Sequence, residues 1–237
     1  MARSAPVACI AGTLAALAGA AGCDGQMIRL GTCPHAEVPA SQVVWIGDSW
    51  VLVPNGEPHT GVRDLARAAG AIGPSDDYTI DAVAAAPMVV PSTNGGPAPI
   101  PTQYSSQEAG ATKVKVLIMD GGTWDTITNN SSATVTDVAD SFKQLLSTVA
   151  SDGTVTDVIY YLMPELSSIP GVAALRPLLE QVCTQSPVPC HFLDLQPIWT
   201  DPSSYNTSGS PPVPTDSGAT VIADAIWSIM QTNCIGQ

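Results

Sequence analysis

The sequence has few positive charges. Its 237 residues include only 8 lysines and arginines against 21 aspartates and glutamates, which gives a formal net charge of −13. Proteins that bind nucleic acid or anionic membrane surfaces need basic patches. The charge balance therefore argues against both partners, and the simplest interpretation of the acidic excess is solubility.

Metal-binding patterns are also missing. The sequence contains no C-x-x-C pair and no cluster of histidines, which are the patterns that indicate a zinc site. We therefore expect neither a metal nor a cofactor. Beyond the first 23 residues, no apolar stretch is long enough to span a bilayer.

The first residues resemble a bacterial lipoprotein signal peptide. Arg3 supplies the positive end, and 7–21 form an apolar run too short for a membrane anchor. Ala20-Ala21-Gly22-Cys23 resembles a lipobox, in which Cys23 would be lipidated. Because Ala20 replaces the usual leucine, cleavage by the general signal peptidase is the alternative. We expect an exported protein, either a cell-envelope lipoprotein held by this anchor or a periplasmic or secreted one.

Four cysteines remain outside the leader and its end. An even number of cysteines in an exported chain indicates disulfides, and four cysteines allow three pairings. We favour Cys183 with Cys190, which closes a small loop, and Cys33 with Cys234, which ties the two ends of the chain together.

Apolar runs and helical periodicities alternate along the rest of the chain. Alternating strands and helices are typical of a parallel sheet with helices on both faces, and the proline-rich segment 87–101 indicates a long loop. We predict a leader over 1–23, a tether over 24–40 and one α/β domain over 41–237. The predicted strands are 43–46, 78–83, 114–119, 158–163 and 191–195, and the predicted helices are 62–69, 135–150, 172–182 and 217–230.

A Gly-Asp-Ser turn follows the first predicted strand. Gly47 permits a tight turn, and Ser49 comes out where the chain leaves the sheet. Ligands bind at the carboxyl ends of the strands in open α/β sheets. Ser49 is therefore a candidate nucleophile, and its alternative role is that of an ordinary turn residue.

This turn and the order of the elements resemble the GDSL/SGNH hydrolase family over 41–232. The resemblance implies a three-layer α/β/α sandwich with a flavodoxin-like parallel sheet, and Ser49 as the nucleophile. It implies an oxyanion hole built from amides near Ala85 and from the block Gly122-Thr123-Trp124-Asp125. The family's asparagine in that block is Trp124 here, and its aspartate and histidine before the last helix are Ser210 and Val213.

The catalytic base is the least defined part of the predicted site. His59, ten residues after Ser49, is the candidate base; His191 begins a strand and is expected to be structural, and His35 lies in the tether. We interpret Asp125 as an acceptor that orders a loop. Trp50 and Trp124 either flank the pocket together with Ala85 and Gly122 or pack in the core.

Two functional hypotheses follow. The first is an exported, monomeric serine hydrolase that acts on acyl or acetyl esters, including those of glycans, with Ser49 as nucleophile. The second is a catalytically silent relative that binds a carbohydrate or cell-envelope ligand through the same cleft. The second has physical weight because loss of a triad base costs about 10⁶ in kcat in subtilisin.

Overall fold

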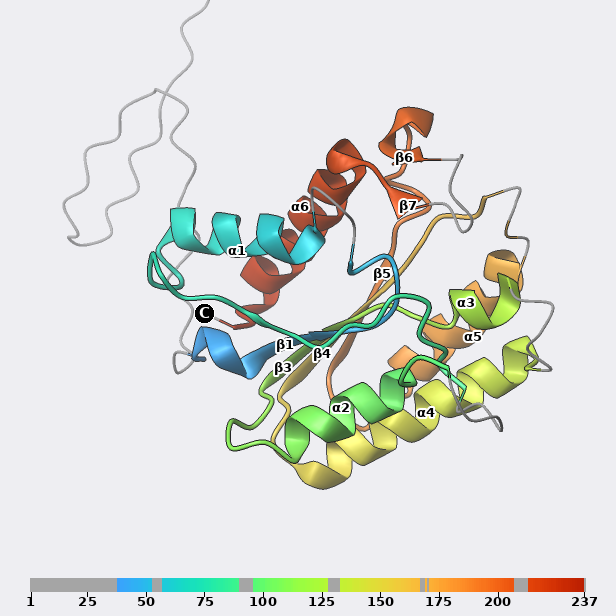
Figure 1. The fold of residues 1–237 in the computed structure, drawn as a ribbon, viewed down its shortest axis with the longest axis horizontal. Coiled ribbons are helices and arrows are strands. Elements are labelled where there is room, and N and C mark those ends of the chain that lie inside the picture. The colour runs from blue at the N-terminus through green and yellow to red at the C-terminus, as the bar shows by residue number, and fades with distance from the viewer. Residues whose placement is uncertain are drawn as a thin grey trace, which may run out of the picture. The chain divides into compact units, whose positions relative to one another are not determined.

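The computed structural model describes residues 38–52, 57–89, 96–127, 133–166, 169, 171–206 and 213–236. Its centre is a five-stranded parallel sheet with the strand order β2-β1-β3-β4-β5 (Figure 1). This is the flavodoxin-like order, in which the chain reverses its direction of winding between β2 and β3. The five strands are β1 (Val43–Ile46), β2 (Thr79–Ile80), β3 (Val116–Met119), β4 (Asp157–Leu162) and β5 (Cys190–Asp194).

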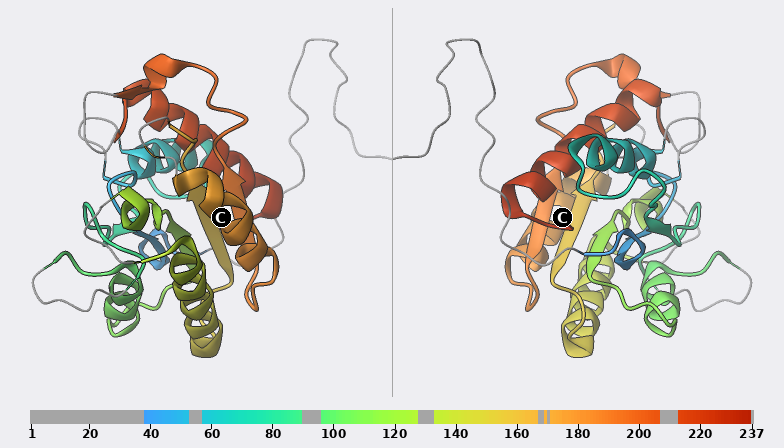
Figure 2. Two further views of the ribbon diagram at one scale, coloured as in Figure 1. Left: turned by 90° about the vertical axis from the view of Figure 1, so that its right-hand side faces the viewer. Right: turned by 90° about the vertical axis from the view of Figure 1, so that its left-hand side faces the viewer.

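Helices cover both faces of the sheet, as Figures 1 and 2 show. On one face α1 (Pro58–Ala69) packs against α6 (Asp216–Asn233). The other face carries α2 (Ile100–Glu108), the short α3 (Thr123–Ile127), α4 (Val135–Asp152) and α5 (Gly171–Thr184). The predicted three-layer α/β/α sandwich is therefore confirmed. A two-stranded antiparallel ribbon of β6 (Tyr205–Asn206) and β7 (Val213–Pro214) precedes α6.

The sheet forms because its central strands are continuous apolar runs. Every residue of β1 and β3 is buried, as expected for strands covered on both faces. Gly61 allows the α1/α6 layer to pack closely, since a Cβ at this position would lie 2.6 Å from the Cβ of Ala223. None of the helices in the described part of the chain is long and apolar enough to cross a membrane.

Three predictions about local structure were wrong. The segment 87–101 is not entirely loop, because α2 begins at Ile100, with Pro99 as its N-cap and Pro101 in its first turn. Proline is tolerated there because first-turn N–H groups have no partner within the helix. The strand predicted over 78–83 is reduced to Thr79–Ile80. Helix α1 also begins earlier than predicted, at Pro58.

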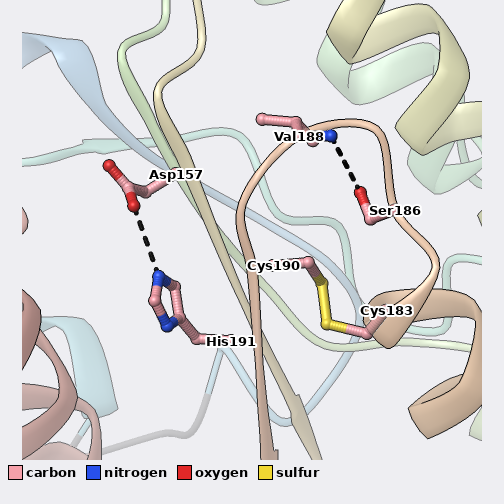
Figure 3. Close-up of a disulfide and its surroundings, with 6 residues drawn as sticks. All are labelled: Asp157, Cys183, Ser186, Val188, Cys190 and His191. Carbon is pink, nitrogen blue, oxygen red and sulfur yellow. Dashed lines mark hydrogen bonds and ion pairs between the residues drawn. A yellow bond between two sulfur atoms is a disulfide. The ribbon is translucent and has the colours of Figure 1, made fainter.

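A disulfide joins Cys183 at the end of α5 to Cys190 at the start of β5, with a Cα–Cα distance of 5.3 Å (Figure 3). This confirms the first predicted pairing. Cys234 is also disulfide-bonded, but its predicted partner Cys33 lies outside the described residues, as does Cys23.

Candidate functional site

The Gly-Asp-Ser turn lies at the carboxyl edge of the sheet, directly after β1. Gly47 has a φ of +141°, which L side chains rarely adopt. Side-chain space is also absent, since a Cβ on Gly47 would lie 1.8 Å from Oδ1 of Asp120. Both the backbone conformation and the packing therefore require glycine before Asp48 and Ser49.

The hydroxyl of Ser49 contacts a backbone amide from the loop after β2. The N–H of Ala85 donates a hydrogen bond to Ser49 Oγ at 3.1 Å. Ala85 has a φ of +62°, a left-handed conformation that favours glycine. In the family resemblance a glycine amide belongs at this place, and here alanine adopts a backbone conformation typical of glycine. Strained residues of this kind are often found at functional sites.

Gln103 of α2 holds the backbone of Gly47 on both sides. Its Oε1 accepts from the N–H of Gly47 at 2.8 Å, and its Nε2 donates to the carbonyl of Gly47 at 3.1 Å. The Gln103 side chain is buried. The carbonyl of Gly47 also accepts from the N–H of Val83 at 3.1 Å. The buried primary amide thus adds to the pairing by the segment after β2 at the point where β1 ends.

Two buried carboxyl groups meet beneath the turn. The N–H of Asp48 donates to Oδ1 of Asp120 at 2.7 Å, and the Asp48 carboxyl accepts from the N–H of Trp50 at 3.2 Å. The two side chains are also hydrogen-bonded to each other. Burial raises the pKa of both groups, and the charge of Asp48 raises that of Asp120 further.

Asp125 fixes the loop that follows Ala85. Its two carboxyl oxygens accept from the N–H groups of Met88 at 2.8 Å and Val89 at 3.1 Å. Burial raises the pKa of Asp125 to about 6, and the two amide hydrogen bonds oppose that rise. The predicted role of Asp125 as a loop-ordering acceptor is confirmed.

The two tryptophans of the predicted pocket differ in exposure. Trp50 is buried and packs against Trp199, with ring centroids 5.4 Å apart. Trp124 is half-buried, and its backbone N–H donates to the Asp48 carboxyl. Gly122 packs against α4, because a Cβ there would lie 2.5 Å from Cγ1 of Val138. Trp50 therefore belongs to the core, whereas Trp124 borders the turn.

His59 lies at the start of α1 and pairs with a carboxylate. Its Nε2 is 3.0 Å from Oε2 of Glu57 and 3.2 Å from Oγ1 of Thr60, and its ring packs edge-on against Trp45. Burial lowers the pKa of His59 to about 4, which outweighs the opposing attraction of Asp77. Among the described residues, the hydrogen bonds of His59 do not reach Ser49.

His191 is the other histidine among the described residues, and it does not lie near Ser49. His191 pairs with Asp157 at 3.3 Å beside the disulfide (Figure 3). Through the register β1-β3-β4-β5 it aligns with Trp45, three strand spacings or about 14 Å away across the sheet. His35 and Ser210 lie outside the described residues. Val213, at the family's histidine position, is half-buried in β7.

Sequence reasoning missed Gln103, Asp120 and Glu57. Asp120 directly follows the strongest predicted strand, a position that can identify it because side chains at strand ends line ligand sites. Gln103 and Glu57 have no such signal. In the described part of the chain, no three potential metal-ligating side chains cluster together.

The fold is shared with carbohydrate esterases of known structure. A family 3 carbohydrate esterase from Talaromyces cellulolyticus superposes with a TM-score of 0.63 at 15% identity, covering 81% of this chain and 97% of that chain. Est24, a carbohydrate acetylesterase from Sinorhizobium meliloti, gives a TM-score of 0.61 at 15% identity, covering 81% and 98%.

A family two carbohydrate esterase from Clostridium thermocellum in complex with cellohexaose gives a TM-score of 0.58 at 14% identity, covering 86% of this chain and 67% of that chain. The chain spans 65% of the length of an active-site mutant of a family two esterase from the same organism. No family model matches the sequence, and no curated protein matches it significantly. At these identities the likeness establishes the fold alone.

Proposed function

We propose that this protein is a serine hydrolase that cleaves acyl or acetyl esters of carbohydrates, with Ser49 as its nucleophile. The hydrogen bond from the Ala85 amide to Ser49 Oγ carries this proposal. It brings a candidate oxyanion donor and a candidate nucleophile within 3.1 Å of each other, at the sheet edge where such folds bind ligands. The carbohydrate esterases that share the fold support the substrate class.

In the proposed reaction, Ser49 Oγ gives its proton to the base and attacks the ester carbonyl. The sugar oxygen then takes up that proton and leaves as a hydroxyl. Water then releases the acyl group from the serine. The amides of Ala85 and Ser49 would donate to the developing oxyanion. The Ala85 N–H would exchange Ser49 Oγ, and the Ser49 N–H the Asp48 carboxyl, for the substrate oxygen. Trp124 has no side-chain amide that could donate to the oxyanion, as the family's asparagine does. We therefore expect an oxyanion hole with one donor fewer than the family pattern and a lower rate of ester hydrolysis.

His59 is the proposed base. Glu57 pairs with its Nε2, as the carboxylate of a catalytic triad pairs with one ring nitrogen, so the buried Nδ1 would have to receive the serine proton. The lowered pKa of His59 keeps the ring neutral at pH 7, which a base requires. Catalysis through His59 would also need the imidazole to approach Ser49 more closely than it does in this structure, directly or through one water.

One observation favours the second candidate function, a silent relative that binds a carbohydrate or cell-envelope ligand. Neither described imidazole, that of His59 or that of His191, is hydrogen-bonded to Ser49. A serine without an adjacent base is a poor nucleophile. Under this candidate, the turn would be retained for its shape and not for its chemistry.

Hydrolysis of a short-chain nitrophenyl ester by the purified protein distinguishes the two candidates. We expect turnover in the wild type that is lost in Ser49→Ala. The single variant His59→Gln should also lose turnover if His59 is the base. Ser203→Ala, which changes an exposed serine elsewhere, is the matched control. Equal background rates in wild type and Ser49→Ala would reject the hydrolase and leave the binding function.

We further propose that the protein is exported and that Cys23 anchors it to the cell envelope. The disulfide between Cys183 and Cys190 supports an oxidising compartment. Mass spectrometry of the protein from membranes tests the anchor: a diacylglyceryl group on Cys23 is expected, and an unmodified fragment that contains this cysteine would contradict it.

A further inference from the structure

The Asp48–Asp120 pair is costly to bury and the proposed reaction does not use it. Both side chains are 4% exposed. None of the ion pairs among the described residues includes either of them. Two ionised carboxylates cannot occupy one buried site at hydrogen-bond distance, because their repulsion adds to the cost of removing each from water. The pair therefore needs a proton.

We propose that Asp120 is a positioning residue for Ser49: it shares one proton with Asp48, and the resulting acid–carboxylate pair locks the turn that carries the nucleophile. Asp120 holds the proton and donates it to the Asp48 carboxylate, while its Oδ1 accepts from the N–H of Asp48. The inference rests on the proposed function only in naming Ser49 as nucleophile.

The hydrogen bonds of the pair converge on the turn from both sides. Asp120 extends from the end of β3 and lies against Gly47. Asp48 receives the N–H groups of Trp50 and Trp124, so it joins the turn to the start of α3. The two carboxyls thus accept hydrogen bonds from backbone groups on either side of Ser49. Two like charges at this place would push those segments apart.

The groups that face the pair are acidic or phenolic. Asp125 from α3 interacts with Asp48, and the hydroxyls of Tyr160 and Tyr161 from β4 interact with both carboxyls. Asp125 has a pKa of about 6, so its charge at pH 7 favours a proton on the pair. Burial raises the pKa of both tyrosines well above 10, so they stay neutral there.

Asp120→Asn tests the shared proton without any substrate. Asparagine keeps the Oδ1 acceptor and replaces the carboxylic O–H by an amide N–H that never titrates. The folded wild type holds a proton that its unfolded chain has lost. Its unfolding equilibrium constant, measured relative to that of Asp120→Asn, should therefore rise by up to tenfold per pH unit as the pH increases above about 4, the pKa of an aspartate in the unfolded chain.

Asp140→Asn removes an exposed carboxylate from α4 and is the matched control, with a pH-independent ratio expected. The infrared carbonyl stretch of a protonated carboxyl should be present in the wild type at neutral pH and absent from Asp120→Asn. The proposal would be overturned if the ratio of the wild-type unfolding constant to that of Asp120→Asn did not change with pH and the wild type showed no protonated carboxyl.

Positioning is tested by the rate at which a fluorophosphonate labels Ser49. We expect Asp120→Asn to keep the wild-type rate within a few-fold and Asp120→Ala to lose about 10²-fold, since a 1 Å misplacement can cost that much. Equal labelling of all three would overturn the positioning role. If wild-type Ser49 is inert, the proposed function fails, while the stability and infrared results still decide whether the proton is shared.

Discussion

The N–H of Ala85 donates a hydrogen bond to the hydroxyl of Ser49 across 36 residues of sequence, at 3.1 Å. The alanine reaches this position only with a left-handed backbone, at a φ of +62°. A loop conformation that is unfavourable for alanine is thus maintained where a candidate nucleophile needs an amide. This relationship suggests that the loop is shaped by the site and not by its own stability.

Replacing Ala85 by glycine should relieve that strain. A left-handed backbone costs an L residue roughly 1–2 kcal/mol, which glycine avoids. We expect Ala85→Gly to raise the free energy of unfolding by up to about 1 kcal/mol, after the entropy that glycine adds to the unfolded chain. Denaturant unfolding measures this, with Ala68→Gly in α1 as a control that should instead be destabilised. A loss of stability in Ala85→Gly as large as that in Ala68→Gly would contradict the strain.

Removing the side chain of Gln103 should destabilise the turn itself. Gln103→Ala leaves the N–H of Gly47 buried without its partner, while the carbonyl keeps its second hydrogen bond, from the N–H of Val83 at 3.1 Å. One unsatisfied buried group costs about 1–3 kcal/mol. We therefore expect a loss of about 1–3 kcal/mol. Gln107→Ala, one turn further along the same helix at a half-buried position, should change stability by less than about 0.5 kcal/mol. Similar losses in the two variants would exclude a specific role for Gln103.

The central strands could be predicted from the sequence because each is an uninterrupted apolar run, and β1 lies at its predicted position, Val43–Ile46. Helix α2 could not, because Pro99 and Pro101 indicate a loop and only tertiary packing shows that they begin a helix. The same limit applies to the site. Ser49 follows from its motif, whereas Gln103 meets Gly47 from 56 residues away, and no local pattern specifies that contact.

The disulfide at the amino end of β5 should affect stability but not the site. It closes a loop with a sequence separation of 7 residues, and chain entropy predicts a contribution of about 2–3 kcal/mol for so short a loop. The double variant Cys183→Ala/Cys190→Ala should therefore unfold at lower denaturant while Ser49 keeps its reactivity. A matched loss of Ser49 reactivity below the unfolding transition would show that the two ends of the sheet are coupled.

The buried imidazole of His59 should make the protein sensitive to acid. Its pKa is about 4 in the folded protein and about 6.5 in an unfolded chain. Between these values the unfolded state binds the extra proton, so stability falls as pH falls through this window. Relative to His59→Gln, which cannot titrate, the unfolding constant of the wild type should rise up to tenfold per pH unit of acidification.

The comparison contains its own control, because wild type and His59→Gln should differ by a constant amount above about pH 7.5, where the imidazole is neutral in both states. Unfolding curves at a series of pH values measure both regions. If the wild type instead gains stability relative to the variant in acid, the attraction of Glu57 outweighs burial. His59 would then be protonated in the folded protein near neutral pH, and the proposed base would have to be sought elsewhere.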